Sequence, residues 1–345
     1  MNLLRVFMRD WLEGNRDCGR SERDRTEPTP SGTRRDSATP IAIGAALVLS
    51  GSALAQTPQA PTASASPTGQ APSTQSPTTP ISSPATESPA AVERAHAHPT
   101  ISTDRPSFSD TAGIAPVGHL QLETGYTFIW RDRNGTETQR HNAPELLARV
   151  GLVNDRFELR LATSGYVWSR TRSPNDTESQ SSEGWSDLAV GVKFKLTDQA
   201  GALPRLAISA ATTTGAGSAG ISSRRAEPTF KLIWSYDLEA LGGAALKGFG
   251  VYGNINASWS TSEGARYWQG AASICGTYAI SDRWGVFAEY YAVFPASKGS
   301  GSSHSIDAGT SYLLTPRVQL DARVGVGLNE TADNLFAGVG FSVLF

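Results

Sequence analysis

The stretch PRVQLDARVGVGL at residues 316–328 alternates apolar side chains with polar or small ones from end to end. A period of two residues places Val318 and Leu320 on one face of a β-strand and Asp321 and Arg323 on the other. Its length fits the roughly 9–11 residues with which a strand crosses a bilayer. The stretch therefore predicts a membrane-spanning strand with one face to lipid and one to a polar interior.

The last residues of the chain continue this pattern. Residues 334–345 alternate again and end in Phe341-Ser-Val343-Leu-Phe345. A strand with a terminal Phe resembles the assembly signal of bacterial outer-membrane barrels. This ending implies the barrel assembly machinery as a partner, recognised through the strand that ends in Phe345.

Segments with the same alternation extend back to residue 119. They predict an all-β fold, a transmembrane antiparallel up-and-down β-barrel of about 12 strands, with ten and fourteen as alternatives. The predicted strands are 119–131, 143–153, 156–168, 186–197, 204–213, 228–238, 248–260, 267–280, 283–294, 304–314, 316–328 and 334–345.

The connectors favour a membrane barrel over a soluble sandwich, which also alternates. Short turns are expected at Asn154-Asp155, Ser281-Asp282 and Thr315-Pro316, and longer loops at 132–142, 169–185, 214–227 and 295–303. The two sets alternate along the chain, as short periplasmic turns and longer outer loops do. The connector at 239–247 is too long for this pattern and that at 329–333 too short. With an even number of strands, both ends of the barrel lie on the periplasmic side.

The N-terminal quarter has a different character. Residues 41–55, IAIGAALVLSGSALA, form a short apolar run with an A-x-A ending, which predicts a secretory signal cleaved after Ala55. Residues 1–40 make the leader unusually long, either as an extended leader or because the start is assigned too far upstream; the Arg34-Arg35 pair also leaves a twin-arginine signal open. The expected domains are 1–55 leader plus signal peptide, 56–99 disordered Pro/Thr/Ser/Ala-rich periplasmic linker, 100–118 pre-barrel segment, and 119–345 barrel.

The totals exclude several classes of protein. Formal net charge is -2, so nothing indicates a nucleic-acid partner. No apolar run reaches the roughly 18 residues of a transmembrane helix. Cleavage would remove Cys18 and leave Cys275 alone, which excludes an internal disulfide and a cysteine metal site. We expect no cofactor and no metal, and outer-membrane lipid as a partner.

The inward faces of the predicted strands carry both charges. The lumen or gating candidates are Glu123, Glu145, Arg149, Glu158, Arg160, Asp187, Lys193, Glu289, Asp307, Asp321 and Arg323, together with Asp104 and Arg105 ahead of the first strand. Buried charges must pair or stay hydrated. The wall charges could form an internal salt-bridge network that stiffens the barrel, or a selectivity filter.

The pre-barrel segment has two interpretations. Residues 100–118 could fold back into the lumen as a plug, with Asp104 and Arg105 pairing with wall charges, or could form a periplasmic strap. The plug interpretation also covers Phe108, which a strap would leave in water. Near the outer mouth, Tyr166, Trp168 and Trp185 are placed on the inward face. They could stack a flat solute or pack against loops.

Several motifs resemble the outer-membrane transporter family of the MetA pathway of phenol degradation. They include Thr103-Asp104-Arg105-Pro106, the run Pro116-Val117-Gly118-His119-Leu120-Gln121-Leu122-Glu123-Thr124-Gly125-Tyr126, and Pro144-Glu145-Leu146-Leu147-Ala148-Arg149-Val150-Gly151-Leu152. The resemblance covers about residues 100–345. It implies transport of small, aromatic or hydrophobic solutes.

The expected function is therefore an outer-membrane channel or transporter, with a structural or adhesin-like barrel as the alternative. A barrel lipid hydrolase is a further alternative, because some barrels of this size carry Ser and His on the outer face. Here His119 and His304 are the outward-facing strand histidines, and no serine–acid set accompanies either in the sequence. We expect no enzymatic activity.

Overall fold

The computed structural model describes residues 99–345 apart from 175–177 and 263. The predicted leader and signal peptide, and residues 56–98 of the predicted linker, lie outside the described residues. No helix in the described part of the chain is long and apolar enough to cross a membrane.

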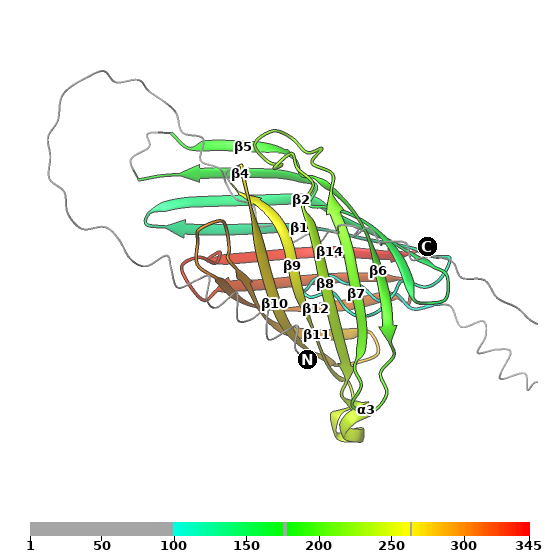
Figure 1. The fold of residues 1–345 in the computed structure, drawn as a ribbon. Coiled ribbons are helices and arrows are strands. Elements are labelled where there is room, and N and C mark those ends of the chain that lie inside the picture. The colour runs from blue at the N-terminus through cyan, green and yellow to red at the C-terminus, as the bar shows by residue number, and fades with distance from the viewer. Residues whose placement is uncertain (1–98, 175–177, 263) are drawn as a thin grey trace, which may run out of the picture. The chain divides into compact units, whose positions relative to one another are not determined.

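Antiparallel strands account for most of the described chain (Figure 1). They are β1 Leu120–Arg133, β2 Thr136–Leu152, β3 Phe157–Thr163, β4 Tyr166–Arg172, β5 Gln180–Trp185, β6 Leu188–Thr197, β7 Arg205–Thr213, β8 Pro228–Asp237, β9 Phe249–Ser262, β10 Ala265–Ala279, β11 Trp284–Phe294, β12 Ser303–Thr315, β13 Val318–Gly327 and β14 Leu335–Leu344.

The strands close into a ring. Along it, β1, β2, β3 and β6 are followed by β7 to β14 in chain order, and β14 pairs with β1. The last residue joins this seam, since the Phe345 backbone N–H donates to the Leu120 carbonyl at 2.8 Å. β4 and β5 lie beyond the ring, β4 on the far half of β2 and β5 on β4 (Figure 1). Within the described residues the barrel is thus closed by twelve strands, which confirms the predicted fold class.

A break at Gly165 separates β3 from β4, although 156–168 was predicted as one strand. Gly165 has a φ of 73°, and a Cβ there would lie 2.0 Å from the Pro144 carbonyl oxygen. The left-handed conformation and the close approach both require glycine. The break shifts the alternation by one residue, so the faces of β4 are the reverse of those expected from β3.

Two predicted loops are largely strand. Residues 132–142 were predicted as a long loop, which is wrong: β1 and β2 continue to a tight hairpin turn at Asn134-Gly135, where φ is 51° and 80°. An Asn-Gly pair with positive φ at both positions suits such a turn. Residues 169–185 likewise contain most of β4 and all of β5. The long connector at 239–247 holds two short helices, α3 Glu239–Gly242 (labelled in Figure 1) and η2 Gly243–Leu246.

The two faces of the wall differ in polarity. Outward side chains such as Val190, Phe194 and Leu161 are exposed around the barrel, as expected for a surface in contact with lipid. Inward side chains include Glu123, Arg149 and several other charged groups with no exposure at all. The interior of this barrel is therefore polar and filled, and the fold places its charged residues in the lumen.

Candidate functional site

Residues 101–117, which we call the luminal segment, run through the inside of the ring. The segment begins where the Ile101 N–H donates to the Pro316 carbonyl in the β12–β13 turn, at 2.8 Å. It ends where Val117 forms a bridge with Gly151 at the end of β2. Between these points it contacts side chains from β1, β2, β3 and β6 and from β8, β9, β10 and β11. These two groups of strands lie on opposite sides of the ring, so the segment occupies the lumen.

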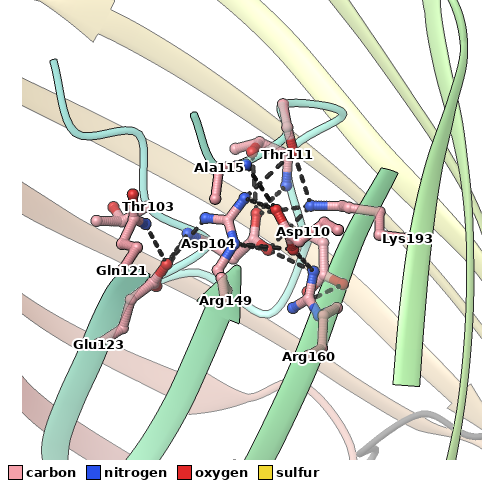
Figure 2. Close-up of polar contacts among 12 residues, drawn as sticks. Thr103, Asp104, Asp110, Thr111, Ala115, Gln121, Glu123, Arg149, Arg160 and Lys193 are labelled. Carbon is pink, nitrogen blue, oxygen red and sulfur yellow. Dashed lines mark hydrogen bonds and ion pairs between the residues drawn. The ribbon is translucent and has the colours of Figure 1, made fainter. Parts of the chain in front are cut away.

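Asp104 is the centre of the first group of contacts (Figure 2). Its carboxylate lies 2.7 Å from Arg160 Nη1, 3.0 Å from Lys193 Nζ and 3.8 Å from Arg149 Nε. The other oxygen accepts from the N–H and hydroxyl of Thr111, both at 2.9 Å. Burial alone would raise the pKa of Asp104, but the three neighbouring positive charges hold it well below its usual range. The carboxylate is therefore charged at neutral pH.

Two acids of the wall bind the segment through its backbone. Glu123 accepts from the backbone N–H groups of Asp104 and Arg105, both at 3.0 Å. Glu158 accepts from the Ala115 N–H at 2.7 Å. Arg149 holds both acids in place, with Nη1 2.9 Å from Glu123 and two nitrogens on the two Glu158 oxygens at 3.0 and 2.9 Å. The same wall side chains thus form a salt-bridge network with one another and bind the backbone of the segment.

Arg105 extends in another direction from the same point of the segment. Its Nη1 lies 2.7 Å from Glu145 and its Nη2 lies 3.4 Å from Asp321. The side chain crosses Gly125 and Gly340, which are paired between β1 and β14. A Cβ at Gly125 would lie 2.3 Å from Arg105 Nη2, and one at Gly340 would lie 2.5 Å from Arg105 Nε. The two glycines form the slot in which the arginine fits.

Residues 107–110 contact the opposite wall. Glu289 accepts from the backbone N–H groups of Phe108 and Ser109, at 2.6 and 2.8 Å. The Phe108 ring stacks on Tyr291 with centroids 4.2 Å apart and an interplanar angle of 5°. Next to this contact, Asp110 pairs with Lys231 at 3.1 Å. Hydroxyl groups add to it, with Ser107 Oγ 2.9 Å from Tyr252 Oη.

A family model described as "Putative MetA-pathway of phenol degradation" matches residues 103–345, which include most of the luminal segment and the whole barrel. The chain belongs to this family. Among curated protein sequences, none matches the chain.

Solved structures are similar to this family member in fold. The COG4313 outer membrane channel from Pseudomonas putida F1 has a TM-score of 0.53 at 15% identity, and the match covers 68% of this chain and 98% of that one. The transport unit of the autotransporter AIDA-I from Escherichia coli gives 0.46 at 11% identity, covering 70% and 92%. The CymD monoaromatic hydrocarbon channel gives 0.36 at 11%, covering 66% and 88%. The first of these likenesses supports the β-barrel fold.

Most of the predicted lumen residues meet at the luminal segment. Asp104 and Arg105 lie on it, and the wall residues in contact with it are Glu123, Glu145, Arg149, Glu158, Arg160, Lys193, Glu289 and Asp321. Arg323 and Asp307 instead approach each other, at 4.0 Å. Asp187 lies elsewhere and holds the 214–227 loop, accepting from Gly217 N–H and Ser222 Oγ at 2.8 Å.

The prediction that Tyr166, Trp168 and Trp185 face the lumen is wrong. Trp168 and Trp185 are exposed on the outer face of the wall, and Tyr166 packs edge-on against Trp185 there. Trp168 stacks on His141, with centroids 4.9 Å apart. The shift at Gly165 is the reason, because it moves every side chain of β4 to the face opposite the expected one, and Trp185 on β5 pairs directly with Tyr166 of β4. These aromatic residues therefore do not line the pore.

Sequence reasoning missed two parts of the site. Asp110 repeats the role of Asp104 six residues later, and its signal was a second acid in the same short segment. Tyr291 faces inward near Glu289 on β11, and the Phe108 ring stacks on it. The only sign of this in the sequence was that Tyr291 has the same position in the alternation as the inward Glu289.

His119 and His304 have few polar contacts. His304 contacts the Tyr290 hydroxyl at 2.7 Å and Ser302 Oγ at 2.8 Å. His119 contacts the Val117 carbonyl at 3.0 Å. Among the described residues, neither ring has a carboxylate partner, whereas a hydrolytic triad needs a group of that kind to orient its histidine. A serine does contact His304, which was not expected.

Proposed function

We propose that this chain is an outer-membrane channel for small aromatic or hydrophobic solutes, and that its luminal segment closes the pore. One observation carries the proposal: residues 101–117 lie inside the closed ring and are bonded to opposite walls. A purely structural barrel has no need of a segment bound in this way across its interior. Rings of charged side chains and obstructing segments are the means by which protein pores control passage.

The inner wall supports passage after the segment moves. The wall residues in contact with the segment carry both charges, so after its departure they would face a hydrated space rather than an apolar core. A twelve-stranded ring is also wider than the eight-stranded barrels that side chains fill on their own. The solute class rests on the family, whose description refers to phenol degradation.

The proposal includes a topology. The segment enters the lumen beside the short β12–β13 turn, and short turns belong to the periplasmic side of such barrels. A signal peptide ending at Ala55 would export the chain, and residues 56–99 would then link the periplasm to the lumen. The strand ending at Phe345 would be the contact with the assembly machinery, and outer-membrane lipid would surround the wall.

Liposome swelling tests the function. Benzenesulfonate is a suitable solute because its permanent charge keeps it from crossing lipid unaided, and cyclohexanesulfonate is its non-aromatic match. Vesicles that carry the protein should swell faster than protein-free vesicles. A variant whose mature sequence starts at Gly118, and so lacks the luminal segment, should swell faster still.

The controls separate the alternatives. Heat-modifiable migration in gels, a property of folded barrels, confirms that each variant has folded. If the folded truncated protein passes neither solute, the chain is a structural barrel. If the full-length and truncated proteins pass solutes equally fast, the luminal segment does not close the pore.

A further inference from the structure

The Phe108 ring stacks on a side chain of the barrel wall. The ring lies parallel to Tyr291 at 4.2 Å, while the backbone N–H groups of Phe108 and Ser109 are bound separately by Glu289. The ring could therefore leave Tyr291 by rotation of its own side chain, without loss of either backbone bond. Parallel stacking at this distance is favourable for any flat aromatic ring.

The wall around Tyr291 contains other groups that pack against aromatic rings. Phe336 of β14 lies beside Tyr291, with centroids 6.2 Å apart, and Arg323 lies over the Phe336 ring at 5.6 Å. Gly325 makes room for Phe336, since a Cβ there would lie 2.1 Å from its Cζ. We call Tyr291, Phe336 and Arg323 the aromatic seat. It belongs to the barrel wall and would remain if the luminal segment moved.

An unsatisfied acid lies next to the seat. Asp307 is opposite Glu289 on the neighbouring strand and is 5% exposed. Neither of its carboxylate oxygens meets a donor in good hydrogen-bond geometry among the described residues: the side chain opposite it is another acid, Glu289, and its nearest cation, Arg323, is 4.0 Å away. A buried carboxylate without donors is costly, so such a group attracts a hydrogen-bond donor. Phe108 brings a ring to this place but no side-chain donor.

We propose that Phe108 occupies the seat of a solute, and that a flat aromatic ring carrying a hydroxyl group competes with it for Tyr291. The solute ring would stack where Phe108 stacks, and its hydroxyl would donate to Asp307. Binding of solute and retention of the Phe108 ring then exclude each other. This inference rests on the proposed function and assigns to it a solute site, whose occupation removes one of the contacts that hold the segment.

Calorimetric titration of the purified full-length protein with phenol tests the competition, and cyclohexanol is the non-aromatic match. Phe108→Ala keeps both backbone donors for Glu289 and frees the seat. Phenol should bind this variant about tenfold more tightly than wild type, the factor expected when Phe108 fills the seat nine-tenths of the time. Cyclohexanol should not distinguish the two proteins.

A second substitution locates the site. Tyr291→Leu in the Phe108→Ala background should abolish the gain, whereas Tyr290→Leu, on the same strand but with its side chain on the outer face, should preserve it. Equal phenol affinity in wild type and Phe108→Ala, or a gain that survives Tyr291→Leu, would overturn the proposal.

This experiment and the swelling assay can fail independently. Solute passage without competition at Tyr291 would leave the channel intact and remove the seat. Competition without solute passage in any folded variant would leave the binding site and remove the channel.

Discussion

Two neighbouring parts of the luminal segment are held by different chemistry. Around Asp104, one carboxylate faces three cations of the wall, and none of the four side chains is more than 10% exposed. Around Phe108 the contacts are one ring stack together with two backbone N–H groups and the Ser109 hydroxyl on Glu289, and the nearest charge on the segment is Asp110, which pairs with Lys231. Removal of one member of a buried ion cluster leaves the others uncompensated, while a lost stack leaves no charge behind. The contacts of Asp104 are therefore an anchor, and the stacked Phe108 ring with its bonds to Glu289 is a releasable latch.

The anchor gives the largest expected effect. Asp104→Ala leaves Arg149, Arg160 and Lys193 close together with less negative charge, and we expect a loss of about 3–5 kcal/mol in the free energy of unfolding. Urea unfolding followed by intrinsic tryptophan fluorescence would measure it, and conductance in planar bilayers should rise at the same time. Asp198→Asn is the matched control, because this carboxylate pairs with Lys195 at 2.8 Å on an exposed turn. A folded Asp104→Ala variant as stable as wild type would contradict the anchor.

The glycine slot under Arg105 gives the next effect. Gly340→Ala would bring a Cβ to 2.5 Å from both Arg105 Nε and Asp321 Oδ1, so the arginine must move. We expect a cost of about 1–3 kcal/mol from overpacking. Gly338→Ala, two residues away on the same face, is the control, because its nearest atoms are 3.1 Å away. Arg105→Ala in the Gly340→Ala background should restore part of the lost stability; no recovery would mean that the slot is not made for Arg105.

The sequence predicted the anchor far better than the latch, for a physical reason. A charged residue on the inward parity of a strand must find a partner, so the alternation alone brought Glu123, Arg149 and Lys193 into the lumen. Ring stacking has no such requirement, and nothing in the sequence pairs Phe108 with Tyr291. The misplaced Trp168 has a different cause, since a single left-handed glycine reverses the faces after it and the period of two cannot foresee this.

The latch should respond to a smaller change. Glu289→Gln keeps the side-chain shape but leaves one acceptor oxygen for two backbone N–H groups, which now use separate oxygens. We expect a stability loss of about 1 kcal/mol and more frequent opening in single-channel recordings. Glu239→Gln on the exposed helix α3 should change neither. If Glu289→Gln opens no more often than wild type, the bonds to Glu289 do not hold the latch closed.

Acidification from pH 7 to pH 5 should leave the ion pairs of Asp104 unchanged. Because the folded-state pKa of Asp104 is lowered, its contribution to stability is complete above the unfolded value of about 3.9 and is lost only as pH falls through the folded value. Between pH 7 and pH 5 the carboxylate stays charged and Arg160 and Lys193 stay paired. Single-channel recordings at the two pH values should therefore show no change that depends on Asp104. The opposite result would be an open probability that rises from pH 7 to pH 5 in wild type but not in Asp104→Asn. It would mean that the Asp104 carboxylate takes up a proton in this range, and that the three neighbouring cations lower its pKa less than their distances imply.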